Sequence, residues 1–114
     1  MRDLLTHTAG FVTDDPWGDR QTPLPEDDFT RLLSQGVPFT RPPSTAMEYS
    51  NLGYALLGRI IANVSQQPYD QFVQGTLLKP LGMSATSHHV ESAPADKRAL
   101  GYRWEDNALS LIHI

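Results

Sequence analysis

A tyrosine, a serine and an asparagine follow one another at Tyr49-Ser50-Asn51, directly before an apolar stretch. A tyrosine phenol can carry a proton, but free phenols titrate only at about pH 10, so a role as a base needs a nearby cation or a positive helix end. A carboxamide suits the binding of a substrate amide because it both donates and accepts. Tyr49 and Asn51 are therefore candidate catalytic residues. The same residues also suit an ordinary helix start, with Ser50 or Asn51 as the N-cap and Tyr49 as its hydrophobic staple.

The other residues whose types could take part in catalysis give weaker indications of a functional site. His7 follows a helix-like segment, where a histidine is an ordinary C-terminal cap. The side chains of His88 and His89 are adjacent in sequence and point apart, and no further ligands accompany them, so no metal site is expected. No serine is followed by a lysine three residues later, and neither a glycine-rich phosphate loop nor a Lys-Thr-Gly sequence occurs. The sequence therefore predicts no cofactor and shows no nucleophile.

The composition argues against several kinds of binding site and binding partner. The chain has 114 residues, a net charge of −4 and no cysteine, which suits one small domain or part of a larger one and excludes disulfides and cysteine-ligated zinc. It has no basic stripe, so a nucleic-acid partner is not expected. Its apolar runs are much shorter than the roughly 20 residues of a membrane-spanning helix. Nothing in the sequence indicates an oligomeric state.

Three helices are expected to position the candidate residues. The first covers 26–35, with acids in its first turn and Gly36 as its stop. The second covers 51–65 and is apolar enough to be buried on most sides, through a stripe that ends at Val64. The third covers about 68–78, with Pro68 in its first turn. Residues 2–10 are typical of a last helical turn that ends at Gly10.

Long irregular segments join these helices. Prolines and glycines predict loops over 10–25 and 36–45, and residues 99–104 could begin a strand. Long ordered loops beside a helix often build functional sites. The predicted fold class is mainly α with long loops.

Three segments in order resemble one known family: Leu4-Leu5-Thr6-His7-Thr8-Ala9-Gly10, Tyr49-Ser50-Asn51-Leu52-Gly53-Tyr54-Ala55-Leu56-Leu57-Gly58 and Lys79-Pro80-Leu81-Gly82-Met83-Ser84-Ala85-Thr86. Together they resemble the serine beta-lactamase-related family, which includes class C beta-lactamases, D-alanyl-D-alanine carboxypeptidases and related esterases. The resemblance covers about residues 2–104. It implies that the chain is part of the helical lobe of the α/β beta-lactamase and transpeptidase-like fold.

The resemblance also implies roles. Family members use a Ser-x-x-Lys nucleophile, a Tyr-x-Asn second motif and a third motif on a strand, and only the second is present here. Tyr49 would move a proton to or from the nucleophile and leaving group, and Asn51 would orient the motif lysine and bind the substrate carbonyl. The implied activity is hydrolysis of a beta-lactam, a D-Ala-D-Ala peptide or a small ester through an acyl-enzyme. Its partner would be a small-molecule or peptide substrate, and the family favours the periplasm or cell envelope.

Both ends of the sequence are expected to be truncated, with the first motif upstream and the third downstream. Residues 109–114 reverse-translate to CTG TCT CTT ATA CAC ATC, which resembles a transposon-end adapter. The expected division is therefore a partial domain over 1–108 and an adapter-derived tail over 109–114, although an ordinary apolar strand would look similar. Such a fragment would be inactive alone. The alternative function is a non-catalytic helical binding module with a hydrolase-like sequence.

Overall fold

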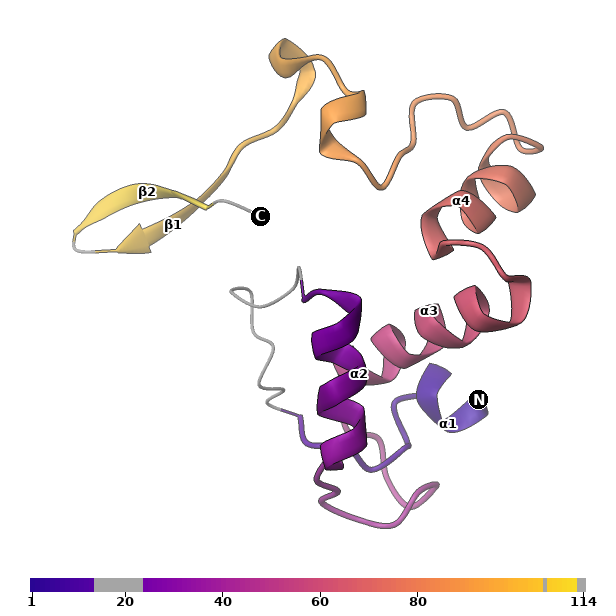
Figure 1. The fold of residues 1–114 in the computed structure, drawn as a ribbon. Helices are drawn as coiled ribbons and strands as arrows, with labels where there is room; N and C mark the ends of the chain where they lie inside the picture. Colours follow the sequence, from indigo (N-terminus) through magenta and orange to yellow (C-terminus); the bar gives the residue numbers. More distant parts are fainter. Residues whose placement is uncertain (14–23, 106, 113–114) are drawn as a thin grey trace. The chain divides into compact units, whose positions relative to one another are not determined.

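The computed structural model of the chain describes residues 1–13, 24–105 and 107–112. The chain divides into two compact units, Met1–Ser65 and Gln66–Ile114 (Figure 1). Most of the loop predicted over 10–25 lies outside the described residues. The described part is mainly helical, as predicted, with one added two-stranded hairpin.

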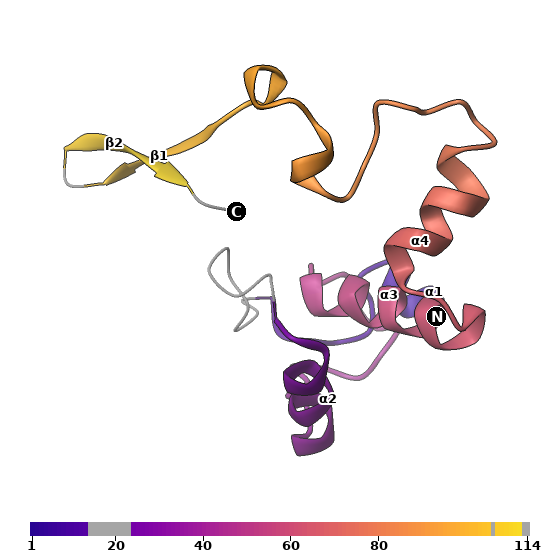
Figure 2. The same cartoon turned by 45° about the horizontal axis from the view of Figure 1, so that its top comes forward.

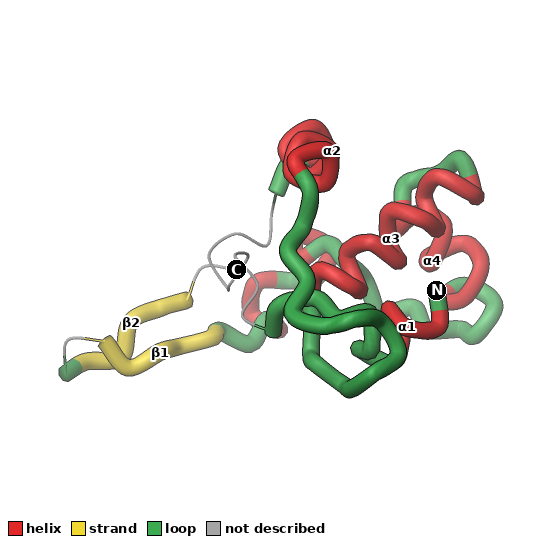
Figure 3. Tube along the Cα trace, turned by 90° about the horizontal axis from the view of Figure 1, so that it is seen from below, coloured by secondary structure: helices red, strands yellow, loops and turns green. Residues whose placement is uncertain are grey.

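The first unit contains three helices, α1 (Arg2–Leu5), α2 (Glu26–Gln35) and α3 (Asn51–Ser65). The observed bounds of α2 and α3 are the predicted ones. Acidic side chains occupy the first turn of α2, and Gly36 ends it with a φ of 89°. Helix α1 packs beside the first part of α3 (Figure 2), whereas α2 is seen end-on in Figure 3 with α3 running across the view.

Only one face of α3 is buried, and the prediction of burial on most sides was wrong. Leu52 and Leu57 are buried near its N-terminal half, whereas the side chain of Val64 is 81% exposed. The physical reason is that α1 packs against α3 but does not cover Val64, which stays exposed in the part of the chain that the structure describes.

The start of the chain also differs from the prediction. Helix α1 ends at Leu5, and His7 then takes a left-handed conformation with a φ of 56°. Gly10 has a φ of 84° and lies so close to the Arg41 carbonyl that an added Cβ would collide with it. Gly10 therefore joins two irregular segments instead of stopping a helix. Its carbonyl accepts the Thr40 N–H at 2.9 Å.

The second unit begins with α4 (Tyr69–Val73), which continues as the π-helix η1 (Gln74–Leu78). The predicted helix over 68–78 is therefore present, but its second half is wound more widely, with the Lys79 N–H donating to the Gln74 carbonyl. Two short 3₁₀ turns follow, η2 (Val90–Ser92) and η3 (Ala95–Lys97).

The second unit ends in an antiparallel hairpin of β1 (Gly101–Glu105) and β2 (Ala108–Ile112), in which Gly101 lies opposite Ile112. The predicted strand in this region is confirmed. Strand β2 includes residues 109–112, and the adapter origin of residues 109–114 stays a prediction.

Candidate active site

Tyr49 and Asn51 lie where the irregular segment after α2 meets the first residue of α3. The Tyr49 hydroxyl donates to Oδ1 of Asn51 at 2.9 Å. Asn51 is exposed and Tyr49 is half-exposed, so both polar groups face solvent. The structure thus brings the two predicted residues together on one accessible surface.

Ser50 lies between them and has a different role. Its side chain accepts the Gly53 N–H at 3.2 Å, which is the bond an N-cap makes to the third residue of its helix. Ser50 is only 3% exposed. The capping interpretation therefore holds for Ser50, whose hydroxyl is buried and not available as a nucleophile. It leaves Tyr49 and Asn51 free for chemistry, so the two interpretations of the tripeptide are compatible.

His7 does not cap α1, contrary to the prediction. Its ring lies next to two tyrosine rings, with centroid separations of 4.6 Å to Tyr49 and 5.0 Å to Tyr54. Its Nδ1 accepts the Ser50 N–H at 3.2 Å, so the hydrogen of the neutral imidazole is on Nε2. Sequence reasoning missed this contact, because a pairing of residues 43 positions apart leaves no periodic signal.

Glu48, the residue before the candidate tyrosine, holds the preceding segment in place. Its Oε1 accepts the Thr13 hydroxyl at 2.8 Å, and its Oε2 accepts the Thr40 hydroxyl at 2.6 Å and pairs with Arg41 Nε at 2.9 Å. These donors, Thr40 foremost, hold the pKa of Glu48 below its usual range because they favour the carboxylate. No feature of the sequence singled out Glu48.

Asp3 in α1 has a similar role. Its Oδ1 accepts the hydroxyls of Ser44 at 2.5 Å and Thr8 at 3.0 Å. The Ser44 bond, followed by the Thr8 bond, lowers the pKa of Asp3. The carboxylates of Asp3 and Glu48 therefore join residues 3–13 to residues 40–48.

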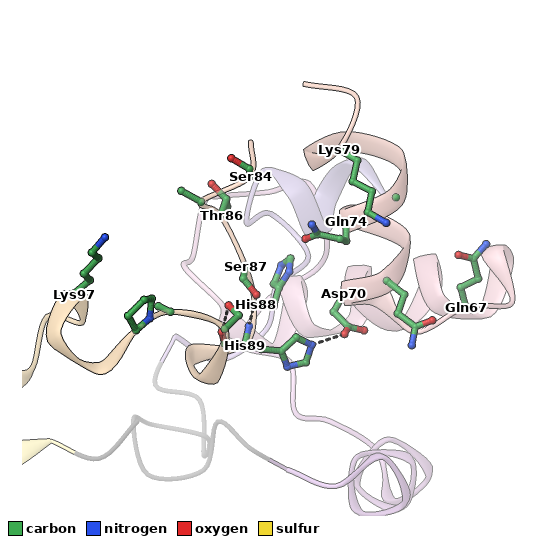
Figure 4. A pocket seen from close by; sticks show the side chains of 16 residues that line it. Gln67, Asp70, Gln74, Lys79, Ser84, Thr86, Ser87, His88, His89 and Lys97 are labelled. Atoms are coloured by element: carbon green, nitrogen blue, oxygen red, sulfur yellow. Dashed lines mark hydrogen bonds and ion pairs between the residues drawn. The ribbon is translucent and has the colours of Figure 1, made fainter. Parts of the chain in front are cut away.

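The second unit contains a polar pocket between α4–η1 and residues 84–97 (Figure 4). His89 Nε2 and Asp70 Oδ2 are 2.7 Å apart there, and this bond lowers the pKa of Asp70. Lys79 and Lys97 also line the pocket. Among the described residues, no group of three or more acidic or histidine side chains is arranged to hold a metal ion. None of the described helices has the length and apolar character that crossing a bilayer requires.

Nearly the whole chain matches one known protein family. The profile described as Beta-lactamase matches residues 1–111. The chain belongs to the beta-lactamase family. This is a family of serine hydrolases, as the resemblance of the three segments predicted.

Individual relatives and solved structures support the same family assignment. The chain is 35% identical to Protein flp of Staphylococcus aureus (strain COL) over 104 residues, which is 90% of this chain and 21% of that protein. The penicillin-binding protein of Bacillus halodurans matches 96% of this chain and 36% of its own, with a TM-score of 0.72 and 30% identity. The D-amino acid amidase of Ochrobactrum anthropi SV3, solved with L-phenylalanine amide, matches 89% of this chain and 29% of its own, with a TM-score of 0.57 and 27% identity.

The chain thus spans about a fifth of the length of Protein flp. The structural matches extend over nearly all of the chain, and they show that it has the fold of part of a beta-lactamase or penicillin-binding protein.

Proposed function

We propose that this chain supplies the second catalytic motif of a serine hydrolase that works through an acyl-enzyme. Tyr49 moves a proton to or from the nucleophile and the leaving group, and Asn51 binds the substrate carbonyl and orients a lysine. The observation that carries the proposal is the exposed Tyr49–Asn51 pair, joined by a 2.9 Å hydrogen bond at the start of α3.

The nucleophile in this proposal is a serine of a Ser-x-x-Lys sequence outside the 114 residues. Within the chain no serine has a lysine three residues later, and the serine beside the motif is buried as a cap. The substrate is an amide or ester: a beta-lactam, a D-Ala-D-Ala peptide or a small ester. The chain by itself is expected to be inactive because it lacks the attacking group.

The test is an assay of the full-length protein that contains this chain on nitrocefin, a D-Ala-D-Ala peptide and p-nitrophenyl acetate. Tyr49→Phe is expected to lower kcat by about 10²–10⁴-fold on the accepted substrate, because it removes the proton-transfer group. Asn51→Ala is expected to lower kcat/KM, because the substrate carbonyl loses a donor. Trapping with a fluorescent penicillin separates acylation from turnover.

Matched controls come from the same chain. Tyr69→Phe in α4 removes an exposed phenol and Asn63→Ala in α3 removes an exposed carboxamide, and neither lies in the motif. Both are expected to keep the activity of the unmodified protein. Wild-type turnover by Tyr49→Phe would overturn the proposal. A full-length protein that carries all three motifs and neither hydrolyses nor traps any substrate would favour the binding-module alternative instead.

A further inference from the structure

We infer that His7 is the positioning residue of this site: it fixes the backbone on both sides of Tyr49 and supports the phenol ring. The inference rests on the proposed function, since it concerns how the proposed proton-transfer residue is held.

The backbone evidence is a pair of bonds from one residue. The His7 carbonyl accepts the Glu48 N–H at 2.7 Å, and His7 Nδ1 accepts the Ser50 N–H at 3.2 Å. The backbone N–H groups of the residues on either side of Tyr49 are thus both bonded to the same residue, although 43 positions separate His7 from Ser50. Because a side chain follows its own Cα, a backbone that is fixed at Glu48 and at Ser50 restricts where the phenol of Tyr49 can point.

The start of α3 explains why a residue from elsewhere is needed. In a capping box, the third helical residue is a Glu or Gln whose side chain reaches back to the N–H of the N-cap. Here that third residue is Gly53, which has no side chain and lies against the backbone of α1 at Leu4. Ser50 accepts from Gly53 but receives nothing back. The imidazole of His7 supplies the missing acceptor for the partly buried Ser50 N–H.

The ring of His7 adds a second restraint. It lies 4.6 Å from the ring of Tyr49 and 5.0 Å from that of Tyr54, and Tyr54 is itself fixed by a 3.1 Å hydrogen bond from its hydroxyl to the Leu5 carbonyl. The phenol ring of Tyr49 therefore contacts an imidazole that is itself in contact with a fixed tyrosine ring. In this arrangement the Tyr49 hydroxyl donates to Asn51.

The left-handed backbone of His7 allows a matched pair of variants. Asn and Gly both adopt a φ near the observed 56° more readily than other residues. In His7→Asn the carboxamide oxygen can replace Nδ1 as the acceptor, whereas His7→Gly keeps the backbone freedom and removes the acceptor and the ring. The comparison therefore isolates the side chain from the backbone conformation.

The experiment measures kcat and KM of the full-length protein on its accepted substrate. His7→Gly is expected to lower kcat about 10–100-fold with little change in KM, because misplacement of a reacting group affects the chemical step. His7→Asn is expected to recover most of that loss. In a Tyr49→Phe background, His7→Gly is expected to cause almost no further loss, because there is no phenol hydroxyl left to position.

The outcomes separate the two proposals. Equal losses from His7→Gly in both backgrounds, or no recovery in His7→Asn, would overturn the positioning role and leave the proposed function intact. Full activity of Tyr49→Phe would overturn the proposed function instead. Without any assay of activity, ¹⁵N NMR of the full-length protein is expected to show the neutral His7 ring with its hydrogen on Nε2, and a neutral ring with its hydrogen on Nδ1 would contradict the inference.

Discussion

Two irregular regions of the molecule are held in different ways. In the unit Met1–Ser65, residues 3–13 and 39–50 are joined by hydrogen bonds between residues 30 to 43 positions apart, several of which end on a carboxylate. In the unit Gln66–Ile114, the described segment from α4 to η3 is held mostly by hydrogen bonds between residues within five positions of each other, whereas the Asp70–His89 pair joins residues 19 positions apart.

The difference indicates where precise geometry is maintained. Bonds within five residues stabilise turns but leave a segment free to move as a whole. Long-range bonds to ionised groups fix one segment against another, and charge-assisted bonds are the stronger kind. The unit Met1–Ser65 contains the long-range bonds to ionised groups, and its Glu48 directly precedes Tyr49 of the candidate catalytic pair.

The largest expected effect concerns the closest approach in the first region. Gly10→Ala is expected to lower the free energy of unfolding by more than about 1–2 kcal/mol, since it combines a left-handed residue with a collision at the Arg41 carbonyl. Gly36→Ala is the matched control, because it has nearly the same φ and open space around it. Urea unfolding of both variants measures the difference. Equal losses would mean that segments 7–13 and 39–50 are not closely fixed.

The next effect concerns Glu48 and has a direction with pH. Because its pKa is lowered in the folded chain, ionised Glu48 stabilises the fold fully above its ordinary pKa of about 4.3, and this contribution is lost as the pH falls through the lowered value. Glu48→Gln is therefore expected to be less stable than the unmodified chain at pH 7, with a difference that shrinks as the pH falls below about 4. Urea midpoints at several pH values measure this.

The control for Glu48→Gln is Glu91→Gln, an exposed acid in η2, which is expected to leave the urea midpoint unchanged at pH 7. Should Glu48→Gln and Glu91→Gln behave alike, the contrast between carboxylate-anchored and local segments would be lost.

The smallest effect is expected in the second region. The Asp70–His89 pair is accessible to solvent, with the His89 side chain 65% and the Asp70 side chain 30% exposed, and ion pairs that solvent reaches contribute little. Asp70→Asn is therefore expected to keep the melting temperature within the scatter of repeated thermal unfolding. A loss comparable to that of Glu48→Gln would show that this pair anchors its segment after all.

The helices could be predicted from the sequence because their signals are local. Acids, a periodic apolar face and a glycine define 26–35, and Ser50 defines the start of 51–65. The wider winding of Gln74–Leu78 was not predicted, since the apolar spacing there fits an α-helix equally well.

The candidate site could be predicted only in part. Tyr49 and Asn51 were found because they are neighbours at a helix start. His7, Glu48 and Asp3 were not, because each acts through a partner tens of residues away in a segment without periodicity. Such pairings depend on how the loops close, and the residue types and their spacing within one segment do not predict loop closure.

The bond between His7 and Ser50 has a consequence for the order of folding. Helices form from neighbouring residues, whereas this bond closes a loop of more than forty residues and must overcome the corresponding loss of chain entropy. The helix that carries Asn51 can therefore form well before the phenol of Tyr49 is oriented. The surface proposed for chemistry would be among the last features to assemble, and in pulse-labelling hydrogen exchange the Ser50 amide should gain protection later than the amides in the middle of α3.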